Sequence, residues 1–243
     1  MMGGTFRAVV TAAAAAGVGI AAFGQRPVLV GTVAACCAIF AIGWPILLDL
    51  PSRTGASVVL LLTGAAAIAV IEITGDFAWV TIVLAGAVLA AFIHELARRD
   101  GRPRLLESVS GVVTGAVIVT SGVGWLAIGA TGAAVELLLA GAVTIAIAAA
   151  VSAVPLPSPY SSIVPIVVTA GGGLWLGYLL VPVGMITGLL GGLAAGLLIA
   201  TTRHLFGQIP NSGQVLPALA AAVLPVAVSG VPVYVLGRVL VAL

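Results

Sequence analysis

Long stretches without a charged residue dominate this chain. They cover residues 8–25, 27–48, 54–71, 77–93, 108–135, 137–202 and 205–237. A helix needs roughly 20 apolar residues to cross a hydrocarbon core of ~30 Å, so most of these stretches match one bilayer-spanning helix each. They lack the alternation of polar and apolar residues that transmembrane strands show. The pattern therefore predicts an all-α, polytopic transmembrane helix bundle.

The stretch 137–202 is too long for one span, and its prolines show where it divides. Pro155, Pro157 and Pro159 lie close together, and Pro182 is followed by Gly184. Proline lacks an N–H and clashes with the preceding helical turn, so these positions predict connections. The sequence then predicts nine spans, at residues 7–24, 27–48, 55–74, 77–97, 107–129, 133–153, 161–181, 183–203 and 214–240.

Composition supports a membrane protein and excludes several other classes. Hydrophobic residues make up 62% of the 243 residues and charged residues only 7%, against about 25% charged residues in soluble domains. A net charge of +2 leaves no basic stripe for nucleic acid, and the low polarity excludes disorder. We expect residues 1–243 to form one integral membrane domain. The first apolar segment is expected to be a retained helix, the alternative being a signal peptide.

The arginines predict the orientation, because short loops rich in Lys or Arg stay in the cytoplasm. Six arginines fall on one side of the nine spans and two on the other, and Arg7 joins the larger group if the N-terminus is cytoplasmic. The predicted location is the inner (plasma) membrane, with the N-terminus in the cytoplasm and the C-terminus outside.

An internal repeat is a further hypothesis. Shifting the chain by 106 residues places Leu50-Pro51-Ser52 on Leu156-Pro157-Ser158 and Gly101 on Gly207. Transporter folds are often built from such repeats. The halves would be 27–130 and 133–240, two parallel four-helix repeats after an N-terminal helix. The alternative is that similar hairpins arise because every span has a similar length.

Three carboxylates are candidates for substrate binding or proton coupling. Glu136 lies a few residues into a predicted span, where a carboxylate is costly unless it is paired, neutral or near the interface. A desolvated carboxyl group can exchange protons near neutral pH, as proton-coupled transport requires. Glu72 and Asp76 flank the turn between the third and fourth spans. The alternative for all three is that they are solvated at the outer surface.

The connection after the fourth span is the densest polar segment. It contains Arg98, Arg99, Arg102 and Arg104. Guanidinium groups bind phosphate bidentately, and basic clusters at the cytoplasmic boundary attract anionic lipids. These arginines are therefore candidates for binding a lipid phosphate, the alternative being that they only determine topology.

Small residues and prolines mark two of the last helices. Gly188, Gly192 and Gly196 recur every four residues, a pattern that lets helices approach closely. They predict tight packing of segment 183–203 on the preceding helix, or on a second copy or another membrane protein. Pro217, Pro225 and Pro232 predict a kinked or discontinuous last helix.

These features leave two main functions open. The first is a small permease or lipid-handling transporter, since the few hydroxyl groups in the spans suit an apolar or lipid-linked substrate. It predicts a cavity near the membrane midplane beside Glu136 or the proline-containing helix. The second is a non-catalytic membrane scaffold or assembly subunit of an envelope or respiratory complex, which predicts no cavity.

An enzyme is less favoured, and no cofactor or metal is expected, because the chain contains no lysine for a phosphate loop and only two histidines. The expected hydroxyl candidates are Thr63, Thr81, Thr114, Thr120, Ser121, Thr144 and Thr169.

Overall fold

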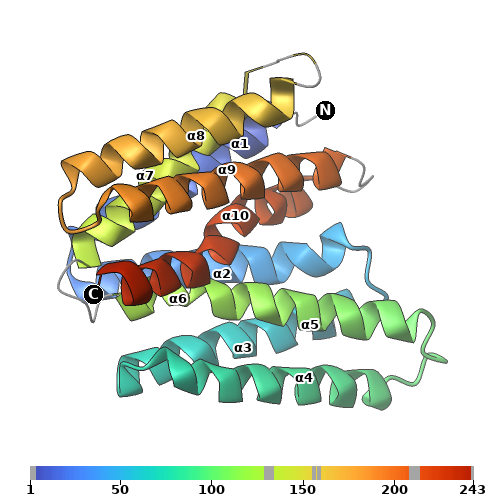
Figure 1. Ribbon diagram of the computed structural model, residues 1–243. Helices are drawn as coiled ribbons and strands as arrows, with labels where there is room; N and C mark the ends of the chain where they lie inside the picture. Colours follow the sequence, from blue (N-terminus) through green and yellow to red (C-terminus); the bar gives the residue numbers. More distant parts are fainter. Residues whose placement is uncertain (1–3, 129–133, 155–156, 158–159, 208–213, 242–243) are drawn as a thin grey trace.

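The computed structural model describes residues 4–128, 134–154, 157, 160–207 and 214–241 (Figure 1). Within these ranges there is no strand, and nine helical segments are long and apolar enough to cross a membrane. The all-α prediction is confirmed, and the predicted spans match the observed helices closely. The helices are α1 (Gly4–Ala21), α2 (Arg26–Leu47), α3 (Arg53–Thr74), η1 (Phe77–Trp79) with α4 (Val80–Ala97), α5 (Leu105–Gly122) with α6 (Gly124–Ala127), α7 (Ala134–Ser152), α8 (Tyr160–Leu179), α9 (Met185–Gly207), and α10 (Val215–Leu236) with a π-helical turn at Gly237–Val241.

Helix α10 lies at the centre of the bundle, between two groups of helices (Figure 1). One group contains α1, α7, α8 and α9, and the other contains α2, α3, α4, α5 and α6. Most of α10 is buried, and its contacts with α2, α5, α1 and α9 join the two groups. The start of α1, the α4–α5 connection and the end of α9 lie at one end of the bundle, which we call the arginine end because it carries residues 98–104.

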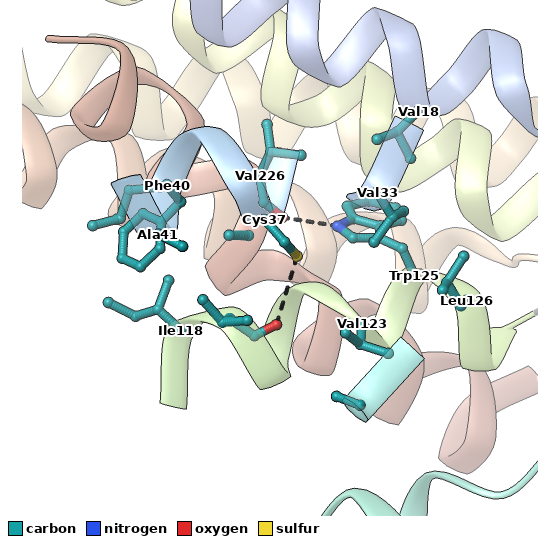
Figure 2. Packing of buried hydrophobic residues seen from close by; sticks show 14 of the residues in the cluster. Val18, Val33, Cys37, Phe40, Ala41, Ile118, Val123, Trp125, Leu126 and Val226 are labelled. Atoms are coloured by element: carbon teal, nitrogen blue, oxygen red, sulfur yellow. Dashed lines mark hydrogen bonds between the residues drawn. The ribbon is translucent and has the colours of Figure 1, made fainter. Parts of the chain in front are cut away.

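The prolines of α10 do not interrupt the helix, because side chains from neighbouring helices satisfy its backbone. Pro232 lacks an N–H, so the carbonyl of Val228 has no helical donor. The hydroxyl of Ser121 donates to this carbonyl at 2.7 Å. Two residues earlier, the indole Nε1 of Trp125 donates to the carbonyl of Val226 at 2.8 Å (Figure 2). Helix α10 is therefore continuous from Val215 to Leu236, which contradicts the discontinuous alternative of the prediction, and it is held against α5 and α6.

Of the two adjacent cysteines, Cys37 belongs to the packed interior and Cys36 is half-buried. Both are free thiols. Figure 2 shows the thiol of Cys37 pointing at α5, where Sγ lies 3.8 Å from the carbonyl oxygen of Val119. Further along α2, the rings of Phe40 and Trp44 stack with centroids 5.0 Å apart. These residues fill the space between α2, α5 and α10.

Helices α8 and α9 approach so closely that their backbones touch. A methyl group added at Gly173 would collide with the backbone of Gly188, and one added at Gly192 would collide with that of Thr169. Such close approach gives dispersion contacts that lipid tails cannot replace. The predicted tight packing of 183–203 on the preceding helix is confirmed.

Helix α1 is an integral part of the bundle and packs on α7 and α10. The hydroxyl of Thr11 donates to the carbonyl of Ala222 in α10 at 2.6 Å. Ala15 and Val18 are almost fully buried.

We predict that Gly192→Val destabilises the protein by about 2 kcal/mol or more, because overpacking a closed contact forces the backbone apart. The matched control is Gly171→Val on α8, where an added side chain meets open space. Thermal unfolding in detergent checks both variants. Equal unfolding temperatures for the two variants would contradict the close α8–α9 contact.

Candidate functional site

A cleft of about 220 Å³ lies between α7, α9 and α10. Its floor includes Gly141, Thr144 and Ser229, all buried, while Ala194 and Pro232 at its rim are exposed. The cleft therefore opens sideways on the surface of the bundle. In a bilayer this surface faces lipid.

The cleft exists because α9 carries small residues on two faces. Gly188, Gly192 and Gly196 are used against α8. Gly191, Ala194, Ala195 and Leu198 follow the spacing of an adjacent helical face and line the cleft. Here the neighbouring helices do not close in, since α10 is held on its other side by Ser121 and Trp125.

The walls of the cleft offer few free polar groups. The hydroxyl of Thr144 lies 2.8 Å from the carbonyls of both Ala140 and Gly141 in its own helix. The hydroxyl of Ser229 donates to the carbonyl of Val226 at 2.9 Å. With these donors engaged, the cleft is suited to an apolar chain rather than to a sugar or an amino acid. Of the hydroxyl groups expected along a path, Thr144 is the one that lines the cleft.

A smaller hollow adjoins the cleft toward the end of the bundle opposite the arginine end. It shares Gly141, Thr144 and Gly191 with the cleft and adds Leu137 and Thr187. The apolar surface therefore runs along the first half of α7. Glu136 precedes Leu137 in the first turn of α7 and is half-buried, but it lines neither hollow.

The other two candidate carboxylates have local partners. Glu72 pairs with Arg26 at 2.6 Å, and Arg26 also donates to the carbonyl of Leu126 at 2.8 Å. Asp76 accepts a hydrogen bond of 2.9 Å from the amide of Ala78 and so caps η1. Glu72 thus links α2 and α3, while Asp76 stabilises the turn before α4.

Most guanidinium groups of the arginine loop are already paired. Arg98 contacts Glu95 and Asp100, each at 2.6 Å. The hydrogen bond from Arg98 holds the pKa of Asp100 below its usual value. The surrounding carboxylates therefore neutralise a cation that sequence reasoning assigned to lipid phosphate.

The remaining loop arginines differ in how many hydrogen-bond and ion-pair partners they have. Arg104 donates to Glu107 at 2.7 Å and to the carbonyl of Asp49 at 2.9 Å. Arg102 donates to the carbonyl of Leu96 at 2.8 Å. Arg99 is exposed, and within the described ranges it has no ion pair.

A buried carboxylate beside this loop escaped sequence reasoning. Glu95 is 1% exposed, and the hydroxyl of Ser108 at the start of α5 donates to it at 2.6 Å. Together with Arg98, this bond ties α4 to α5. The three-residue spacing of Glu95 and Arg98 at the end of α4 is a signal that could have indicated this pair, but the contribution of Ser108 depends on tertiary packing.

Ser52, His94 and Glu95 resemble a nucleophile, base and acid only in composition. The Nε2 atom of His94 lies 3.1 Å from the hydroxyl oxygen of Ser52 and 3.9 Å from Glu95. A catalytic triad places the nucleophile and the acid on opposite ring nitrogens. Here both face the same nitrogen, so the arrangement links α3 to α4 without forming a relay.

Comparisons with known proteins give no relative: no family model, no curated protein and no solved structure matches this chain. The site must therefore be interpreted from its own geometry.

We predict that Glu95→Gln lowers the free energy of unfolding by about 3 kcal/mol, because it removes the buried charged partner of Arg98 and leaves that guanidinium with only the exposed carboxylate of Asp100. The matched variant Glu107→Gln removes an exposed carboxylate and should cost less than about 1 kcal/mol. Chemical denaturation in detergent measures both. Equal losses of unfolding free energy in the two variants would show that the buried Glu95–Arg98 pair stabilises the protein no more than an exposed pair does.

Proposed function

We propose that this protein is a small permease or lipid-handling transporter for an apolar or lipid-linked substrate. The observation that carries the proposal is the cleft between α7, α9 and α10. It is lined by small and aliphatic residues and opens sideways, where a molecule dissolved in the bilayer could enter without crossing water.

The position of α10 supports this proposal. Pro232 lines the cleft, and the helix is central to the bundle. In transporters, substrate sites lie near the bilayer midplane. A change in the packing of α10 would alter the width of the cleft.

The alternative function, a non-catalytic scaffold, has less support. It was expected to have no cavity and to present the glycines of 183–203 to a partner. Those glycines instead pack on α8 within the chain. A second copy or a membrane protein partner of α9 would therefore have to bind its remaining exposed face. We propose no catalytic role for the Ser52–His94 contact, because Glu95 faces the same ring nitrogen as Ser52.

Glu136 stays our candidate for proton coupling. It is half-buried next to Leu137, which lines the hollow adjoining the cleft. A protonation change there would alter charge at the outer end of the substrate path. Lipid movement that is insensitive to an imposed pH gradient would remove this role.

We further propose an inner (plasma) membrane location, with the arginine end and the N-terminus in the cytoplasm and the C-terminus outside. Seven of the nine arginines lie toward this end by the order of the spans. The positive-inside rule supports this assignment.

We predict that Gly191→Leu blocks lipid movement because a leucine side chain fills the cleft. The position has room, since an added methyl group would lie 3.8 Å from the nearest side-chain atom, in Leu236. Movement of a fluorescent phospholipid in proteoliposomes should fall at least tenfold. Gly171→Leu, which projects into open space, should leave the rate unchanged.

Two outcomes of this assay contradict the proposal. One is that the unmodified protein moves no lipid. The other is that Gly191→Leu and Gly171→Leu have equal rates. Absence of lipid movement, combined with purification as a stable complex in gentle detergent, would favour the scaffold function.

The orientation is tested by labelling cysteines at opposite ends of the bundle. Gly75 and Gly101 both have positive φ, at 67° and 78°, so Gly75→Cys and Gly101→Cys impose similar backbone strain. In intact cells, an impermeant maleimide should label Cys at position 75 and not at position 101. Labelling at position 101 alone would invert the topology.

A further inference from the structure

Two arginines from opposite ends of the sequence line one pocket at the arginine end. Arg7 lies near the start of α1, and Arg203 lies near the end of α9. Both line a pocket with Ser152 of α7, Thr202 of α9 and Pro225 of α10. The two positive charges act on each other electrostatically. The fold thus places two like charges in a shared hollow.

The guanidinium groups of Arg7 and Arg203 have more N–H donors than the surrounding residues have acceptors for them. The Nη1 atom of Arg203 is buried and has no hydrogen-bond partner. Arg7 donates to the carbonyl of Phe206 across 3.3 Å. Among the residues that the structure describes, no carboxylate lies within 4.0 Å of either group. A guanidinium has five N–H donors, and leaving such donors unpaired in a buried position is costly.

The hydroxyl groups of the pocket do not supply a counter-charge. Thr11 donates to Ala222, Ser152 donates to Ala149, and Thr202 lies 2.8 Å from the carbonyl of Leu198. Their protons are directed at backbone carbonyls in α7, α9 and α10. The guanidinium groups therefore remain as the free donors of the pocket, and an anion is the ligand that would satisfy them.

This pocket follows the cleft along the same three helices. On α7 the cleft ends at Ile145, and the pocket begins at Ala149, one turn later. On α9 the cleft includes Leu198 and the pocket Ile199. On α10 the pocket includes Pro225 and the cleft Val228. An apolar cleft is thus followed by a cationic pocket at the level where α1 begins and α7 and α9 end.

We propose that Arg7 and Arg203 bind the phosphate of an amphiphilic lipid whose hydrocarbon chain lies in the cleft. This inference rests on the proposed function and names its substrate class. Phosphate suits paired guanidinium groups because its oxygens accept two parallel N–H bonds from each. The adjoining apolar cleft favours a lipid headgroup over free phosphate. Of the loop arginines predicted to hold lipid phosphate, Arg98 and Arg104 are less available because they are paired with carboxylates.

The test measures binding to the purified full chain in detergent with three probes. The probes are dihexanoyl phosphatidic acid, dihexanoylglycerol and inorganic phosphate. Phosphatidic acid should raise the unfolding temperature and bind at least tenfold more tightly than either other probe. Arg203→Gln and Arg7→Gln should each weaken its binding at least tenfold. Arg99→Gln, which removes an exposed arginine from the loop, should leave the binding unchanged.

The unfolding temperatures of the ligand-free variants distinguish a loss of binding from a loss of structure. Removing a half-buried cation whose Nη1 atom is buried and unpaired should leave the unfolding temperature of Arg203→Gln equal to that of the unmodified protein, or raise it. Should that variant fail to fold, Arg203→Lys keeps the charge but loses the planar fork, and it should bind phosphatidic acid at least threefold more weakly.

Unchanged affinity in Arg203→Gln, or in Arg203→Lys if only that variant folds, would overturn the inference. If dihexanoylglycerol binds as tightly as phosphatidic acid, the pocket is not an anion site. If inorganic phosphate binds as tightly, the pocket does not select a lipid headgroup. The proposed function fails separately: arginine-dependent binding without lipid movement in proteoliposomes leaves the binding site in place and removes transport. Lipid movement without arginine-dependent binding would support transport and remove the phosphate-binding site.

Discussion

Hydrocarbon provides no water for backbone polar groups, so every carbonyl and N–H within the membrane needs a partner inside the chain. This constraint explains the position of α10. Its prolines remove backbone donors, and the hydroxyl of Ser121 satisfies the carbonyl that Pro232 leaves free. Trp125 adds a second bond to the carbonyl of Val226. Because these partners come from α5 and α6, α10 is fixed on that side and leaves space toward α7 and α9.

Small residues have two opposite effects in the same helix. On one face of α9, glycines let the backbone contact α8 directly. On the adjacent face, Gly191 and Ala194 meet no closely packed neighbour, and a cleft results. The difference lies in the neighbour: α8 is free to close in, whereas α10 is tied to α5. A glycine pattern alone therefore does not distinguish a packed interface from an open cavity.

The sequence was sufficient to predict the helical framework. Uncharged stretches and proline clusters located the nine spans, since both reflect local requirements of a helix in lipid. The tight α8–α9 contact also followed from a local pattern. The buried pair of Glu95 and Ser108 did not, because these residues meet only after α4 and α5 pack. Arg7 and Arg203 are almost two hundred residues apart, so their common pocket could not be foreseen. The loop arginines were visible, but their pairing with Asp49, Glu95 and Asp100 depends on the fold of the loop.

The central claim is that a phosphate-bearing lipid occupies the path formed by α7, α9 and α10. The most direct measurement is a cryo-electron microscopy map of the full chain in nanodiscs containing phosphatidic acid. The account predicts elongated density in the cleft beside Gly191 and Pro232, continuous with a headgroup between Arg7 and Arg203. Side chains or a partner helix filling the cleft, or a lipid whose headgroup lies at the opposite end of the bundle, would contradict it.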